Sequence, residues 1–139
     1  MSGKNQYVST LNWQSTNPIT GFLPANFAGG SRPSGVVSGV MTDSSTIYSN
    51  MLDVAKMDSI GLELTWTGTP TGTISVMASN SGINAYSLTF SPVLGQPAGS
   101  AGGYVIDLSL YPFRYLYIQY VNSSGTGALT SYLQLKDLN

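Results

Sequence analysis

From residue 35 onward, hydrophobic and polar positions alternate in short runs that clusters of Gly, Pro, Asn and Ser separate. The runs are rich in Val, Ile, Thr, Tyr and Leu, the residues that strands favour. A helical period is nearly absent, and only residues 50–57 could compete as a helical turn. The pattern therefore predicts an all-β domain of about eight strands. The expected strands are residues 35–42, 47–54, 59–66, 73–79, 86–90, 104–108, 114–121 and 128–136.

Several of these runs show which side of the strand is buried. In residues 59–66, every second side chain is apolar, and the side chains between are Gly, Glu and Thr, as a half-buried strand requires. The apolar side of this run is formed by Ile60, Leu62, Leu64 and Trp66. The same alternation returns in residues 73–79, 114–121 and 128–136. We expect these apolar sides to form one core.

Two Gly-rich turns connect neighbouring runs and predict β-hairpins. Residues 67–72 (TGTPTG) join the third and fourth runs, and residues 122–127 (NSSGTG) join the last two. Residues 91–103 form a long Gly/Pro-rich loop of the kind that carries function or lies at an interface. About eight short strands with such turns predict a two-sheet sandwich of jelly-roll type.

The first part of the chain has a different pattern. Residues 1–33 show neither helical period nor sustained alternation, and Pro and Gly interrupt them repeatedly. We predict an irregular extended N-terminal arm over residues 1–33, followed by a β-sandwich domain over residues 34–139. The arm carries too much apolar surface to remain solvated. Two alternatives stay open: the arm completes the core of its own domain, or it reaches onto a neighbouring subunit.

The composition argues against an enzyme. The 139 residues include no His and no Cys, and only 8% are charged. General bases, nucleophiles and transition-metal ligands near neutral pH are usually His or Cys. The acidic residues suggest neither a catalytic pair nor a calcium loop by their spacing; they are Asp43, Asp53, Asp58, Glu63, Asp107 and Asp137. We expect no catalytic residue, no metal site and no cofactor.

The charge also restricts the partners. A net charge of −1 provides no cationic field for phosphates, so we expect no nucleic-acid partner. No apolar run approaches the roughly 18–20 residues that span a bilayer, so we expect no membrane span. A surface with so few charges favours association, and we predict a homo-oligomeric assembly subunit. The alternative is a monomeric module whose surface is polar without charge, made of Ser, Thr, Asn and Gly.

Aromatic residues are the candidate contact sites. Tyr115 and Tyr117 fall on the side of their strand opposite Leu116, and a hairpin would place Tyr132 on the same outward face. This tyrosine row could be covered by the arm or a neighbouring subunit, could stack against sugar rings, or could pack under a loop. Together with aromatic residues of the arm, the predicted interface residues are Trp13, Phe22, Phe27, Tyr115, Tyr117 and Tyr132.

Three stretches of the sequence carry a family resemblance. They are GLELTWTGTPTGTISVMASNSG, SPVLGQPAGSAGGYVIDLS and YPFRYLYIQYVNSSGTGALTSYLQLKDLN, and the match covers about residues 57 to 139. This pattern resembles small β-sandwich structural proteins of tailed and tailless bacteriophages. The resemblance implies a virion component such as a capsid decoration, penton, spike-base or tail-associated protein. It implies no catalytic residues, and its partners would be copies of itself and other virion proteins.

A second interpretation comes from a shorter likeness. RYLYIQYV, followed by a closing strand, resembles the penultimate strand of discoidin-like and other carbohydrate-binding sandwiches. This implies a lectin-like module with a host glycan as partner. A lectin would need an exposed Trp or Tyr beside loop Asn, Asp or Arg in a concave site, whereas a virion subunit would bury its aromatic residues between chains.

Overall fold

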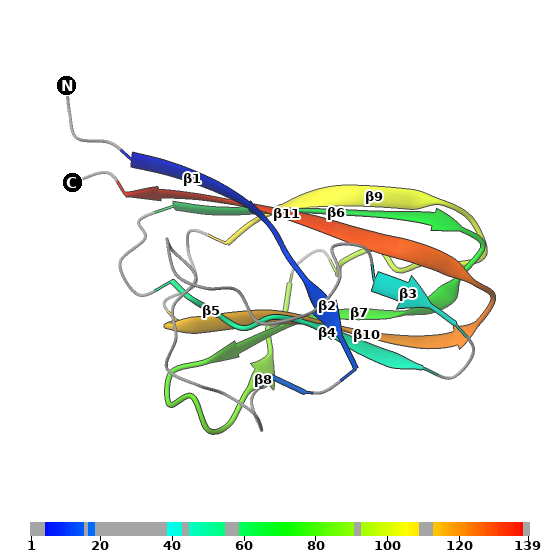
Figure 1. The fold of residues 1–139 in the computed structure, drawn as a ribbon, viewed down its shortest axis with the longest axis horizontal. Coiled ribbons are helices and arrows are strands. Elements are labelled where there is room, and N and C mark those ends of the chain that lie inside the picture. The colour runs from blue at the N-terminus through cyan, green and yellow to red at the C-terminus, as the bar shows by residue number, and fades with distance from the viewer. Residues whose placement is uncertain are drawn as a thin grey trace.

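The computed structural model confirms an all-β sandwich of jelly-roll type (Figure 1). It describes residues 5–15, 17–18, 39–42, 45–54, 59–90, 93–108 and 113–137. Over these residues the regular structure consists of eleven strands. They form two antiparallel sheets that face each other across a single apolar core.

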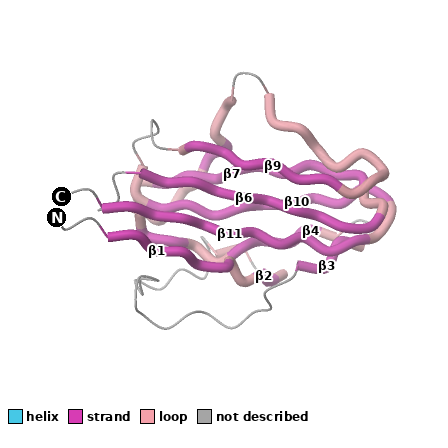
Figure 2. The backbone as a smooth tube through the Cα atoms, turned by 90° about the horizontal axis from the view of Figure 1, so that it is seen from above, coloured by secondary structure: helices cyan, strands magenta, loops and turns pink. Residues whose placement is uncertain are grey.

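The first sheet, called sheet A, has five strands in the order β1-β11-β6-β9, with β3 also beside β11 (Figure 2). Its strands are β1 (Asn5–Thr10), β3 (Gly39–Met41), β6 (Ser59–Gly68), β9 (Gly102–Asp107) and β11 (Gly127–Asp137). The β1 and β3 strands share one edge of β11, because β3 pairs near the start of β11 and β1 pairs with its second half. Strand β9 forms the opposite edge.

The second sheet, called sheet B, has six strands in the order β2-β4-β10-β7-β8, with β5 also beside β10. Its strands are β2 (Trp13–Gln14), β4 (Thr46–Ser49), β5 (Leu52–Asp53), β7 (Thr71–Ser79), β8 (Tyr86–Ser87) and β10 (Tyr115–Ser124). The long central strands β7 and β10 lie beneath β6 and β11 of sheet A in Figure 1.

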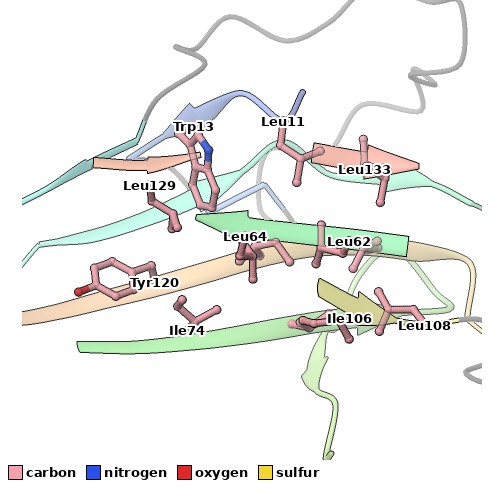
Figure 3. Packing of buried hydrophobic residues seen from close by; sticks show 14 of the residues in the cluster. Leu11, Trp13, Leu62, Leu64, Ile74, Ile106, Leu108, Tyr120, Leu129 and Leu133 are labelled. Atoms are coloured by element: carbon pink, nitrogen blue, oxygen red, sulfur yellow. The ribbon is translucent and has the colours of Figure 1, made fainter. Parts of the chain in front are cut away.

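The predicted apolar sides form the core. Leu62 and Leu64 of β6 are fully buried, and Ile74 and Tyr120 meet them from sheet B (Figure 3). Between them, Glu63 and Thr65 point outward and are exposed. The period-2 alternation thus identified the inner side of these strands correctly, as expected when one face of a sheet is buried.

The two predicted hairpins are wrong. Strands β6 and β7 lie in different sheets, and so do β10 and β11; β6 pairs with β11 and β7 pairs with β10. Each Gly-rich turn therefore crosses from one sheet to the other instead of joining paired neighbours. The reason lies in the core: across such a turn, the apolar sides of successive strands face each other and bury one another. Alternation alone cannot distinguish this arrangement from a hairpin.

The crossing turns stack at one end of the sandwich and are joined by backbone hydrogen bonds. Thr69 N donates to Thr126 O at 2.9 Å, and Gly99 N donates to Pro70 O at 2.9 Å. Gly125 has a φ of 74°, and a Cβ at this position would stand 2.1 Å from Thr69 O. Glycine is therefore required where two crossing turns touch. This explains the Gly-rich motifs that suggested hairpins.

The long loop before β9 closes an edge of sheet B. Leu88 N donates to Val76 O at 2.9 Å, and Gly72 N donates to Pro97 O at 3.1 Å. Between them, the side-chain amide of Gln96 accepts from Ile74 N and donates to Ile74 O. The amide thus takes the place of a strand partner. Since unpaired edges invite aggregation, this segment protects the sheet.

The prediction of an irregular arm needs correction for its first part. Residues 5–10 form β1, paired with β11 from Asn5↔Asp137 to Thr10↔Tyr132, and β2 pairs with β4. Leu11, which lies between β1 and β2, and Trp13, the first residue of β2, are buried in the core (Figure 3). This segment therefore completes its own domain, because apolar side chains in it fill the space between the sheets. The predicted domain boundary after residue 33 lies outside the described residues.

Candidate functional site

The structure separates the predicted tyrosine row. Tyr115 and Tyr117 lie on the outer side of sheet B, whereas Tyr132 lies on the outer side of sheet A. The expectation of one row across a hairpin is therefore wrong, because β10 and β11 belong to different sheets. Tyr117 is only 2% exposed, and Tyr132 is 43% exposed. Tyr132 is the predicted tyrosine that remains accessible to a partner.

Contacts within the chain cover the sheet B tyrosines. The Tyr117 ring lies 6.3 Å from the Tyr48 ring, and its hydroxyl hydrogen-bonds with the side chain of Asn17. Burial raises the pKa of Tyr117 above its usual value. Beside it, the guanidinium of Arg114 lies 5.0 Å from the centre of the Tyr115 ring. This part of sheet B is thus packed by the chain itself.

The other predicted interface residues are either buried in the core or outside the described residues. Trp13 is a core residue and is 2% exposed, so it offers no surface. Phe22 and Phe27 lie outside the described residues. Whether any of the six contacts another subunit stays a prediction.

The outer side of sheet A is open. On one rung of the sheet, Tyr132, Glu63 and Val105 lie side by side, and on the next, Gln134, Gly61 and Asp107 do so. We call these residues, with Val40, Thr65 and Thr67 of the same side, the open face. Gly61 is partly buried, and all other residues of the open face are exposed, with Val105 at 72%. Figure 2 looks down on this sheet.

Gly61 makes the open face concave. Among the described residues, and apart from its chain neighbours, no atom lies within 4 Å of the point where a Cβ would stand. A hollow of about 410 Å³ lies there and extends over the rung that Tyr132 and Val105 share. Its charged neighbours, Glu63 and Asp107, are both acidic. The open face therefore combines apolar and neutral polar side chains with two acidic ones and no basic one.

A second hollow, of about 460 Å³, lies where β7 ends beside β8. It includes Tyr86, which is 73% exposed. The sequence analysis missed this site because it treated residues 86–90 as an ordinary strand, and the regular part is only Tyr86–Ser87. The available signal was the mostly polar stretch SNSGIN at residues 79–84, two residues before the aromatic Tyr86.

The described residues contain neither a cluster of possible metal ligands nor a helix that could span a membrane. Among them, no three His, Cys, Asp or Glu side chains gather closely enough to hold a metal ion. Asp43 and Asp58 lie outside the described part of the chain. In the same residues, no helix has the length and apolar character needed to cross a bilayer.

Comparisons with known proteins identify no family. No protein-family model matches the chain. No curated protein is significantly similar to it in sequence.

The solved structures with partial similarity come from proteins of different kinds. The carbohydrate-binding module TmCBM61, solved with β-1,4-galactotriose, is 13% identical with a TM-score of 0.44, over 92% of this chain and 86% of that one. The K1 cleaved adhesin domain of Lys-gingipain from Porphyromonas gingivalis is 12% identical with a TM-score of 0.40, over 98% of both chains. A chain of infectious bursal disease virus, Gx strain, is 14% identical with a TM-score of 0.37, over 97% of this chain and 34% of that one. Since these TM-scores lie below 0.5, they indicate no function for this chain.

Proposed function

We propose that this protein is a non-enzymatic structural subunit of a bacteriophage virion, in a decoration, penton, spike-base or tail-associated position. In this proposal it forms homo-oligomers and contacts other virion proteins through the open face of sheet A. The observation that carries the proposal is that this face leaves Val40, Val105 and Tyr132 exposed on a regular sheet surface.

The physical argument is burial of exposed apolar side chains on a chain that has few charged residues. Stable soluble domains usually have charged residues over about a quarter to a third of their surface, and this chain has 8% charged residues overall. A second sheet packs on such a face at a distance of about 10 Å, with side chains interleaved. Each 100 Å² of apolar surface removed from water contributes about 2.5 kcal/mol before the costs of association. Repeated contacts in a closed assembly strengthen it further.

The experiment is light scattering of the purified protein over a concentration series. The test variant is Val105→Asp, which replaces an exposed apolar side chain of the open face with a second carboxylate beside Glu63. The matched control is Val121→Asp, since Val121 is exposed on the outer side of sheet B. We expect an oligomer for wild type and for the control, and a lower mass for Val105→Asp. A wild-type monomer at every concentration would overturn the assembly proposal.

The virion location needs its own measurement. Particles purified by density gradient should contain this chain in a fixed ratio to the major capsid protein, as measured by quantitative mass spectrometry. The Val105→Asp chain should be depleted from particles assembled in its presence. Failure to find the chain in purified particles would contradict the virion location, whatever its oligomeric state.

The second candidate function is a carbohydrate-binding module. One observation favours it: the hollow beside β8 joins the exposed Tyr86 with loop Asn and Ser side chains. This is the concave combination that a lectin requires. The hollow and the open face belong to different sheets, so one protein could use both.

A further inference from the structure

The hollow beside β8 has an apolar floor and a polar rim. It lies at the end of β7, next to the green connection to β8 at the lower left of Figure 1. Its floor includes Leu88 and Phe113, which pack against the core, and the nearly buried Ala78. Tyr86 pairs with Ala78 across the β7-β8 ladder and is exposed. The rim residues are Asn80, Ser81, Asn84 and Ser87.

Hydrogen bonds hold the rim in place before any ligand binds. Asn80 Oδ1 accepts from Arg114 N at 2.8 Å, which leaves the Nδ2 hydrogens of Asn80 as donors. Ser81 Oγ accepts from Ile83 N at 3.0 Å and from Asn84 N at 3.2 Å, so its own hydrogen can be donated. Such fixed side chains lose little conformational freedom when a ligand binds.

The start of this loop is fixed as well. Gly82 N donates to the hydroxyl of the buried Ser79 at 2.9 Å, and Gly82 has a φ of 76°. The glycine is needed because other residues rarely adopt this conformation. The rim is therefore part of a defined turn that is attached to the end of β7.

The charge of the hollow restricts its ligand. None of the nine residues that line it is charged. The nearby cation, Arg114, pairs with Asp53 at 3.4 Å and lies against the ring of Tyr115. An anionic ligand would therefore find no free countercharge in the lining. A purely apolar ligand would leave the amide and hydroxyl groups of the rim without partners, which is costly.

We propose that this hollow binds an uncharged saccharide, with a sugar ring against the Tyr86 ring and sugar hydroxyls bonded to Asn80, Ser81 and Asn84. A sugar ring offers C–H groups to an aromatic surface and hydroxyls at its edge, which matches the floor and the rim. The volume of about 460 Å³ falls in the range of small-molecule sites. This inference rests on the second candidate function above and names its site and ligand class.

The test is an NMR titration of the isotope-labelled full chain. The probes are cellotriose, maltotriose, N,N′,N″-triacetylchitotriose and lactose as uncharged saccharides, and sialyllactose as a charged one, each up to about 10 mM. With at least one uncharged probe, we expect shifts in the amide signals of residues 78–88 and 113. Tyr86→Ala should weaken that binding by about fivefold to tenfold, the effect of losing one aromatic contact.

Two variants serve as controls. Tyr132→Ala removes an exposed tyrosine from the other sheet and should leave the binding unchanged. Tyr86→Phe keeps the ring and removes only the hydroxyl. It should retain most of the affinity, because the proposed contact with the sugar is made by the ring. Binding that maps to the open face would overturn this inference but keep the second candidate function. Binding of sialyllactose alone would overturn the uncharged class, and no binding of any probe would overturn both.

Discussion

The outer sides of the two sheets have similar alternating sequences but different surroundings. On sheet B, Tyr117 is buried by Tyr48 and Asn17 of the same chain. On sheet A, Tyr132 pairs with the exposed Glu63 and is itself 43% exposed, and no ring contact of the kind that covers Tyr117 is present on it among the described residues. The same residue type is thus structural on one sheet and available for binding on the other. The two sheets differ in whether residues from distant parts of the chain cover the tyrosine, and not in the local sequence pattern.

We expect the largest effect on stability from a comparison of two tyrosine-to-alanine substitutions, one on each sheet. Tyr117→Ala should lower the free energy of unfolding by about 3 kcal/mol, because it leaves a cavity beneath packed side chains. Tyr132→Ala should lower it by about 1 kcal/mol or less, because Tyr132 is already 43% exposed and loses only cross-strand contacts. Urea unfolding followed by circular dichroism measures both. Equal effects would show that the chain does not itself stabilise the outer side of sheet B.

A smaller effect is expected in the pH dependence of stability, through a tyrosine on the inner side of sheet A. Tyr104 packs edge-on against Trp66, with ring centres 5.8 Å apart, and burial raises the pKa of Tyr104 to about 12. The folded state therefore holds this proton more tightly than the unfolded state, whose tyrosine pKa is about 10. The resulting stability is complete below pH 10 and should be lost as the pH rises from 10 to 12.

Urea unfolding between pH 9 and pH 12 should reveal that loss. Tyr104→Phe is the matched control, since its ring can pack against Trp66 without a hydroxyl. The control should show a shallower decline in stability over the same range. A decline of identical slope in both proteins would contradict the assignment to Tyr104.

The smallest effect distinguishes two glycines of sheet A. Gly61→Ala has open space for its methyl group and should raise the free energy of unfolding by about 0.5 kcal/mol. Gly103→Ala would place a Cβ 2.5 Å from Leu64 O and should lower it by about 1 kcal/mol. Thermal unfolding of the two variants provides the comparison. If Gly61→Ala were as destabilising as Gly103→Ala, this would contradict the presence of free space next to Gly61 on the open face.

Much of the fold was predictable because burial leaves a local signature. The alternation of Leu62 and Leu64 with Glu63 identified the inner side of β6, and the Gly-rich turns marked the strand ends. The long loop before β9 was also found, although its role as an edge cover was not. That role depends on Gln96, whose amide meets Ile74 over 22 positions in the sequence. No local pattern reports such a contact.

The candidate sites were less predictable. Tyr132 was among the predicted contact residues, but Val105 and the glycine hollow beside it were not, since they come from three strands that meet only in the folded sheet. The Tyr86 hollow likewise depends on Phe113, which comes from a distant part of the chain. A site assembled from several strands leaves little trace in any one of them.

The sequence by itself determined most strand-forming segments after residue 35, the side of the long strands that faces the core, and the low charge of the chain. These properties depend on neighbouring residues and on composition. Only the tertiary structure decided that the Gly-rich turns cross between sheets, that Leu11 and Trp13 enter the core, and which outer side stays open. The physical reason is that alternation defines two sides of a strand without naming their neighbours. The neighbours follow from pairing and packing between residues far apart in the chain.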